Sequence, residues 1–210
     1  MDFGLSGLAK QMRAPWEPTD REPRDVLSRT VDLHGGDYAL GLLEDVLRLR
    51  ESALADDVIS TVWQAAGGGV NDLTVVGTGA REWLTELADT CVARLRRHDP
   101  GFEVGSPAPS RVPGERVTEV MAELRAASPA LDAETARGDD ATPVSGVPEA
   151  LEQVVTRVDA GLGFRLFLRA MKSYTVPVTE AQSDRLYALE RRLGYEDVVD
   201  DDCLFVVYGD

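Results

Sequence analysis

The chain has 210 residues, 43% of them apolar, and a formal net charge of −15. It is long enough to bury a substantial core as one domain or two small ones, and it lacks the run of about 18 apolar residues that spans a membrane. The negative charge argues against binding a nucleic-acid backbone, where Lys and Arg must replace counterions, and it repels anionic membranes.

Two local features concern the compartment. Cys91 and Cys203 lie 112 residues apart and form no metal-type pair, so we expect reduced thiols in a cytoplasmic protein. The first residues, MDFGLSGLAKQMR, carry an acid at position 2 and no continuous apolar segment. This stretch is therefore not typical of a secretory signal.

The N-terminal region predicts two short helices. Apolar residues recur at helical spacing over residues 3 to 13, which indicates a weakly amphipathic helix. A connector with several prolines follows over residues 14 to 23. Pro23 then stands where proline commonly opens a helix, so we expect a second short helix from that residue.

Residues 35 to 69 predict the clearest unit, two helices joined by a tight turn and packed as an antiparallel hairpin. Asp37 and Ser52 have side chains suited to cap the two helices, and the glycines at 67 to 69 are suited to end the second. The apolar positions expected to face the core are Leu40, Leu43, Val46, Leu47, Val58, Val62 and Trp63.

The middle of the chain predicts two more helices, over about 80 to 98 and 115 to 127. LTVV at 73 to 76 is ambiguous between a short strand and a helix start. Residues 128 to 148 hold few bulky apolar groups and much Pro, Gly, Asp and Thr, as in a mobile linker or a long surface loop.

That segment is the best candidate for a domain boundary. It divides the chain into an N-terminal helical part, residues 1–127, and a C-terminal helical part, residues 149–210. The second part ends in a possible strand. A single continuous domain is the alternative.

Beyond the boundary, two helices are expected before residue 174, and a third over 179 to 193 is expected to be capped by Thr179 and ended by Gly194. YTVPV at 174 to 178 and CLFVVY at 203 to 208 have strand-like composition, so the third helix would stand between two strands.

The fold class predicted is mainly α, a helical domain with helical hairpins and at most a small C-terminal sheet. An α+β domain that uses 73–76, 174–178 and 203–208 is the alternative. The other expected core positions are Leu84, Leu87, Cys91, Val120, Leu124, Val154, Phe167, Leu186, Leu189, Phe205 and Val207.

No catalytic motif is complete. GTGARE at 77 to 82 lacks the third glycine of a dinucleotide fingerprint and the Gly-Lys-Ser/Thr of a P-loop, which favours a simple turn. His34 has Asp32 and Asp37 nearby, but a loop histidine is the simpler interpretation. Cys91 and His98 lie seven residues apart, about 10 Å along a helix, which is too far for a direct hydrogen bond. We therefore predict no metal, no cofactor and no catalytic residue.

The basic residues of the C-terminal part suggest a second kind of site. Arg165, Arg169 and Lys172 would align on one face of a helix, and a phosphate or carboxylate could dock there. Pairing with the protein's own acids is the simpler use. Arg185, Arg191 and Arg192 are candidates to neutralise the acidic tail that follows them.

The acidic residues are the remaining candidates for a binding site. Five acids fall within the seven positions from 196 to 202. Consecutive acids suit calcium poorly, because neighbouring side chains of an extended segment point to opposite faces. Solvation of the connection into a strand is the simpler role for these acids. We expect a non-enzymatic protein that binds a basic protein partner, and an immunity or antitoxin type of inhibitor is the most specific form of this expectation. A carboxylate- and metal-dependent enzyme around His34 or the terminal acids, and a structural scaffold, are the alternatives. The candidate partner-binding residues are Glu196, Asp197, Asp200, Asp201, Asp202, Glu44, Asp45, Asp56 and Asp57.

Overall fold

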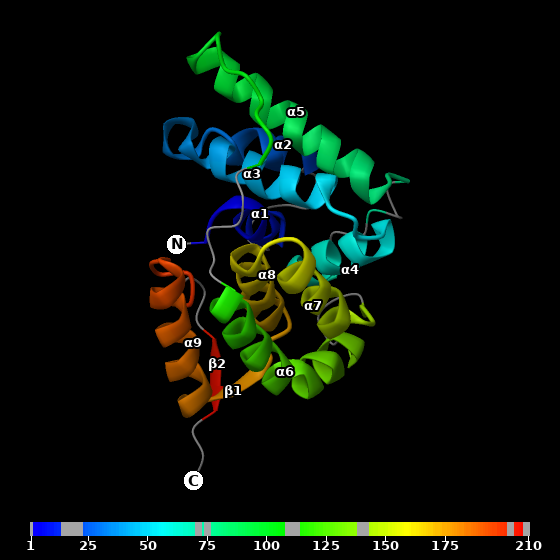
Figure 1. Cartoon of the computed structure of the whole chain (residues 1–210). Helices are drawn as coiled ribbons and strands as arrows, with labels where there is room; N and C mark the ends of the chain where they lie inside the picture. Colours follow the sequence, from blue (N-terminus) through cyan, green and yellow to red (C-terminus); the bar gives the residue numbers. More distant parts are fainter. Residues whose placement is uncertain are drawn as a thin grey trace.

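The computed structural model describes residues 2–13, 23–69, 73, 77–107, 114–137, 143–200 and 204–207 (Figure 1). The elements in chain order are α1 (Gly4–Arg13), α2 (Pro23–Thr30), the 3-10 helix η1 (Leu33–Gly36), α3 (Asp37–Glu51), α4 (Asp56–Ala66), α5 (Ala80–His98), α6 (Gly114–Arg137), α7 (Val147–Arg157), α8 (Ala160–Ser173), β1 (Pro177–Thr179), α9 (Glu180–Leu193) and β2 (Phe205–Val207). The mainly helical fold class with a small C-terminal sheet is therefore confirmed. Within the described ranges, no helix has the length and hydropathy to cross a membrane.

Helix α8 is the centre of the molecule, because every one of its residues is buried. It packs against α1, α4, α6 and α7. Gly163 lets α7 approach closely, since a Cβ at this position would overlap Val155. The pairs α6–α7 and α7–α8 are neighbours in the chain and in space, so they are the helical hairpins of this fold.

Helices α5, α3, α1 and α8 stack in that order from the top of Figure 1 toward its centre. The predicted hairpin of residues 35 to 69 is therefore wrong in its packing, because α3 lies along α5 whereas α4 packs on α7 and α8. Arg81 at the start of α5 supplies a physical reason. Its guanidinium donates to the carbonyls of Arg50, Ser52 and Leu54 and so occupies acceptors at the end of α3.

The predicted helix caps have mixed outcomes. Thr179 accepts a hydrogen bond from the Gln182 N–H, and Gly194 ends α9 in the left-handed conformation, as expected. Asp37 is instead the first residue of α3 and makes no side-chain cap, while Ser52 follows the end of that helix. The glycines after Ala66 end α4 as predicted.

The expected linker at 128–148 is helical over its first ten residues. Helix α6 continues to Arg137 through Pro129, and it buries Leu131 and Thr135 completely. Buried side chains before and after the 138–142 gap belong to one hydrophobic cluster. The prediction of a loop is therefore wrong for 128–137. Burial of Leu131 and Thr135 stabilises the helix there, although the segment has few bulky apolar residues.

The C-terminal strand–helix–strand arrangement is confirmed in outline. Strands β1 and β2 pair in parallel, with Val178 opposite Val206, and α9 connects them. Phe205 and Val207 are 52% and 45% exposed, so the prediction that these two residues belong to the core is wrong. Leu40, at 55% exposed, is the other predicted core residue that lies at the surface. Only Leu73 of the ambiguous LTVV stretch lies among the described residues, and it is buried.

Candidate functional site

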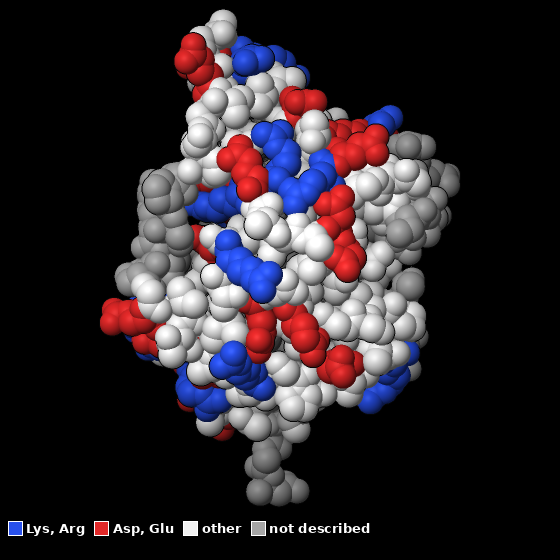
Figure 2. All heavy atoms as spheres, turned by 45° about the vertical axis from the view of Figure 1, so that its right-hand side comes forward, with Lys and Arg blue, Asp and Glu red and all other residues white. Residues whose placement is uncertain are grey.

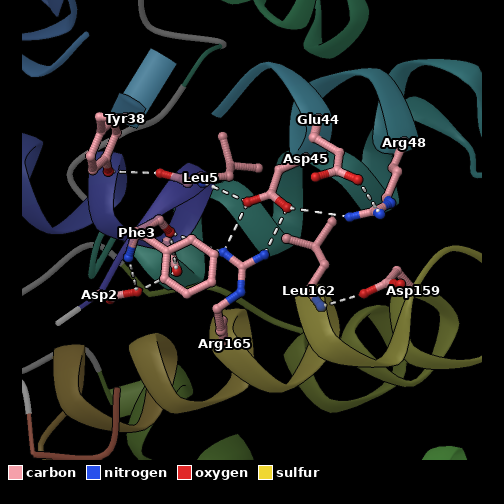
Figure 3. Close-up of polar contacts among 12 residues, drawn as sticks. Asp2, Phe3, Leu5, Tyr38, Glu44, Asp45, Arg48, Asp159, Leu162 and Arg165 are labelled. Carbon is pink, nitrogen blue, oxygen red and sulfur yellow. Dashed lines mark hydrogen bonds and ion pairs between the residues drawn. The ribbon is translucent and has the colours of Figure 1, made fainter. Parts of the chain in front are cut away.

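A buried ion pair between α3 and α8 lies at the heart of the site (Figure 3). Arg165 Nη2 donates to Asp45 Oδ1 at 2.7 Å, and Nη1 donates to Asp45 Oδ2 at 2.9 Å. Each side chain is at most 3% exposed. The same groups hold the N-terminal segment, because Asp45 accepts from the Leu5 N–H and Arg165 donates to the Phe3 carbonyl.

The sequence permits this approach at Gly4. Its φ is +59°, and a Cβ there would overlap the Asp45 carboxylate. Burial alone would lower the pKa of the Arg165 guanidinium, but the adjacent Asp45 carboxylate outweighs it and raises the pKa above the ordinary value. Arg165 is therefore a permanent buried cation.

Two aromatic rings enclose the Arg165 guanidinium. Its central carbon lies 4.2 Å from the Phe3 ring centroid and 5.7 Å from that of Tyr195. The two rings meet edge to face at 5.6 Å. The Tyr195 hydroxyl lies against Gly161, where any side chain would collide with it. Tyr195 thus connects the end of α9 to the start of α8.

A hollow of about 350 Å³ opens beside this pair. Helix α3 contributes Gly41, Glu44 and Arg48 to its lining, and Asp159 and Arg192 contribute further charges. Glu44 accepts a hydrogen bond from Arg48 at 2.6 Å, and Asp159 caps α8 by accepting from the Leu162 N–H at 2.7 Å. The lining therefore combines opposite charges with the aromatic wall of Phe3 and Tyr195.

The segment that leaves this hollow, residues 195–200, is called the acidic loop here. Two buried charged side chains bind the backbone of this loop. Lys172 Nζ donates to the Val198 carbonyl at 2.6 Å, and Glu190 Oε1 accepts from the Val199 N–H at 2.7 Å. Val198 and Val199 are each 1% exposed.

The acidic residues of the loop lie at the surface. Glu196, Asp197 and Asp200 are all exposed, and Asp197 has a φ of +58°, a left-handed conformation that Asp tolerates better than most residues. The Tyr187 hydroxyl donates to Asp200. Asp201 and Asp202 lie outside the described residues. The loop therefore presents acids from a backbone that the core holds in place.

The other predicted acids are not gathered at one place. Asp56 and Asp57 are exposed at the start of α4, where Asp56 pairs with Arg81 at 2.8 Å. Glu44 is partly exposed at the hollow. Asp45, a candidate partner-binding residue, is 2% exposed and therefore does not lie at the surface. Its carboxylate is directed inward because Arg165 supplies a buried partner.

The basic residues also differ from expectation. Arg165, Arg169 and Lys172 are at most 8% exposed, so they do not form a surface stripe for an external anion. Arg185 pairs with Glu123 at 2.7 Å, and Arg192 pairs with Glu119 at 3.0 Å. Both glutamates belong to α6. These two arginines therefore pair with α6 and not with the acidic tail, which they were expected to neutralise.

The weaker motifs occupy structural positions. Gly79 precedes α5 and donates its N–H to the Glu82 side chain, as a helix-start turn does. Asp32, which a metal site at His34 would need, accepts from Arg94 and Arg97 instead. Burial raises the pKa of the Cys91 thiol to about 12. In the described part of the chain, no group of three His, Cys, Asp or Glu residues is placed to hold a metal ion.

Charge is mixed on the face shown in Figure 2, where the right-hand side of Figure 1 has been turned forward. Basic and acidic side chains alternate there, and neither sign forms a broad patch. The negative charge of the chain is therefore not concentrated on that face.

Sequence patterns did not identify the residues that hold the site. Lys172 binds the Val198 carbonyl, and Glu190 accepts from the Val199 N–H. Tyr195 packs beside Arg165, and the Phe3 carbonyl accepts from Arg165, 162 positions away in the chain. The available signal was the occurrence of three cations in the otherwise apolar stretch GLGFRLFLRAMKSY. Cations in so apolar a helix indicate buried pairs as much as a basic surface.

Comparison of the chain with protein-family models, curated proteins and solved structures found no match.

Proposed function

We propose that this chain is a non-enzymatic, acidic cytosolic protein that binds a basic protein partner through the acidic loop. Inhibition of that partner, as immunity proteins and antitoxins do, is the most specific form of the proposal. The observation that carries it is the construction of the loop: exposed Glu196 and Asp197 stand between Tyr195, which packs on Arg165, and Val198, which Lys172 holds.

A fixed loop favours binding for two reasons. Ordering a surface segment on association costs conformational entropy, and a segment that the core already holds incurs less of this cost. Clustered carboxylates also raise the local potential and accelerate the encounter with a basic surface. Arg185 and Arg192, two of the arginines predicted to neutralise the acidic tail, are paired instead with Glu123 and Glu119 of α6.

The test uses three immobilised proteins in a lysate of the source organism. One is the natural chain, one has the five acids Glu196, Asp197 and Asp200–Asp202 replaced by their amides, and the third is a matched control. The control loses the same number of charges at exposed positions elsewhere, through amides at Asp25, Asp89, Glu103, Asp132 and Glu149.

We expect the natural chain and the control to retain a basic protein at low salt and to release it at high salt. The loop variant should fail to retain that protein. Equal capture by all three proteins, or no specific capture by the natural chain, would contradict the proposal. Thermal melting of each variant shows whether lost capture reflects lost folding.

A further inference from the structure

Strands β1 and β2 form a sheet with one covered face and one exposed face. Val178 is 2% exposed and Val206, opposite it, packs on the hydrophobic core, so these two side chains form the inner face. Successive side chains of a strand point to opposite faces. The outer face is therefore formed by four residues that are all exposed: Pro177 and Thr179 of β1, and Phe205 and Val207 of β2.

The outer face is apolar along β2. Phe205 and Val207 are 52% and 45% exposed, and they are two of the five large apolar side chains that are exposed in the described part of the chain. The other three, Leu33, Leu40 and Val104, are scattered over η1, α3 and the segment after α5. Single apolar side chains at a surface are ordinary, whereas neighbouring ones favour a contact surface.

β2 also has a free edge. Among the described residues, β1 is the only strand that pairs with it, so the N–H and C=O groups on the other side of β2 have no strand partner there. Charged side chains and proline commonly protect such an edge, because it can pair with another extended segment. Phe205–Val207 contains neither. β2 therefore offers the backbone groups and the apolar side chains that an added strand would contact.

The acidic loop lies within reach of the same segment. Helix α9 lies beside β2 (Figure 1), and its Tyr187 hydroxyl donates to Asp200 of the loop. Asp200 precedes Phe205 by five positions, which corresponds to at most about 18 Å of extended chain. An extended segment of about six residues has a similar length. One such segment can therefore contact both β2 and the acidic loop.

Charge distinguishes between two occupants of this edge. A second copy of the chain would bring a second acidic loop and a second net charge of −15, so repulsion opposes pairing between copies. A basic segment has the opposite sign to the loop, and this attraction adds to the pairing of the strands.

We infer that an extended segment of the basic partner adds to this sheet as a third strand beside β2. The inference rests on the proposed function and specifies what the chain recognises in its partner. The backbone of the segment pairs with the free edge of β2, and its apolar side chains, at every second position, lie beside Phe205 and Val207. Lys or Arg residues at one end of the segment face the acidic loop.

The test selects peptides from a phage-displayed library of random dodecapeptides on the immobilised full chain, and fluorescence anisotropy then measures binding of the most enriched peptide. We expect the enriched sequences to combine Lys or Arg with β-branched or aromatic residues at every second position. Phe205→Thr/Val207→Thr retains residues suited to a strand but removes the apolar surface, so it should weaken binding about tenfold or more. Leu40→Gln/Val104→Thr removes two exposed apolar side chains elsewhere and should bind like the natural chain.

Methylation of the peptide backbone separates strand pairing from simple apolar contact. In an added strand, the N–H groups of alternate residues face β2 and the others face away. N-methylation of one alternate set should therefore abolish binding, whereas N-methylation of the other set should preserve it. Equal effects of the two sets would overturn the inference. This comparison uses the natural chain, so it does not depend on how a variant folds.

Four further results would overturn the inference. They are no enrichment of peptides over bare resin, equal binding of the peptide by a folded Phe205→Thr/Val207→Thr protein, equal binding by the five-acid loop variant, and a dimer of the natural chain that Phe205→Thr/Val207→Thr abolishes in analytical ultracentrifugation. The capture experiment separates this inference from the proposed function. A basic protein that Phe205→Thr/Val207→Thr retains and the loop variant does not would overturn strand pairing alone.

Discussion

Lys172 and Val198 are joined by a buried hydrogen bond across 26 positions of the chain, from the ammonium of one to the backbone carbonyl of the other. Burial of a lysine is costly unless its donors are paired. Here it ties the acidic loop to the central helix α8. The exposed carboxylates on that loop are thus supported by a cation inside the molecule.

Replacing Lys172 by Met keeps the apolar stem but removes the donor. The Val198 carbonyl then loses its partner, which should lower the free energy of unfolding by about 1 to 3 kcal/mol. Hydrogen exchange of the amides at 195–200 should accelerate about tenfold or more, because their local opening becomes easier. Arg125→Gln, which removes an exposed ion pair with Glu152, is the control. Unchanged exchange in the loop of Lys172→Met would contradict the role of this contact.

The Asp45–Arg165 pair should behave as a buried unit. Arg165→Met and Asp45→Leu each leave one buried charge without its partner, and each should cost about 3 to 5 kcal/mol of unfolding free energy. The double variant removes both charges and should be more stable than the sum of the single costs predicts. Urea unfolding of the four proteins measures this coupling. Strictly additive costs would show that the two groups do not stabilise one another.

Cys91 supplies a dependence of stability on pH. Its thiol is fully buried, and burial raises the pKa from its ordinary value of 9.0 to about 12. The folded thiol stays neutral while the unfolded one ionises, so its contribution to stability is present below about pH 9 and is lost as the pH rises from there toward 12.

The measurement is the free energy of unfolding of Cys203→Ser and of Cys203→Ser/Cys91→Ala, each at pH 7 and at pH 10. The loss of unfolding free energy caused by the Cys91 replacement should be smaller at pH 10 by about 1.4 kcal/mol, because pH 10 lies about one unit above the ordinary pKa and each unit is worth about 1.4 kcal/mol. An equal cost at the two pH values would show that the thiol is accessible to solvent.

Trp63 tests the packing of α4. It is 3% exposed, and its ring lies 5.9 Å from that of Trp83 on α5. Trp63→Ala should therefore cost about 3 to 5 kcal/mol in chemical denaturation, whereas Trp63→Phe should cost less because it leaves a smaller cavity. A loss below about 1 kcal/mol for Trp63→Ala would place the side chain at the surface.

Local chemistry explains which parts of the fold could be predicted. The Thr179 side chain caps the start of α9, and Gly194 ends the helix because glycine readily adopts a positive φ. Both ends could therefore be predicted from the sequence. Helix α6 continues beyond Pro129 because Leu131 finds a place in the core, and that support comes from other elements. Arg81 of α5 likewise binds carbonyls at and just after the end of α3, 27 to 31 positions away in the chain, a contact that helical spacing does not reveal.

The candidate site shows the same division. The acids at 196 to 202 are evident from charge alone. Arg165 was placed in a basic stripe because its partner, Asp45, lies 120 positions away and helical spacing carries no information about that contact. Only the fold shows that the acidic loop rests on Lys172 and Glu190.

The most direct test of the account measures how fast the captured basic partner associates, by stopped flow at several salt concentrations. The three proteins are the natural chain, the five-acid loop variant and the control variant with the same net charge. The account predicts that the loop variant associates about tenfold or more slowly, with a weaker dependence on salt, while the control stays close to the natural rate. Melting temperatures should stay nearly equal, because exposed charges contribute little to stability. Equal association rates for the loop variant and the control would contradict the claim that the acidic loop forms the binding surface.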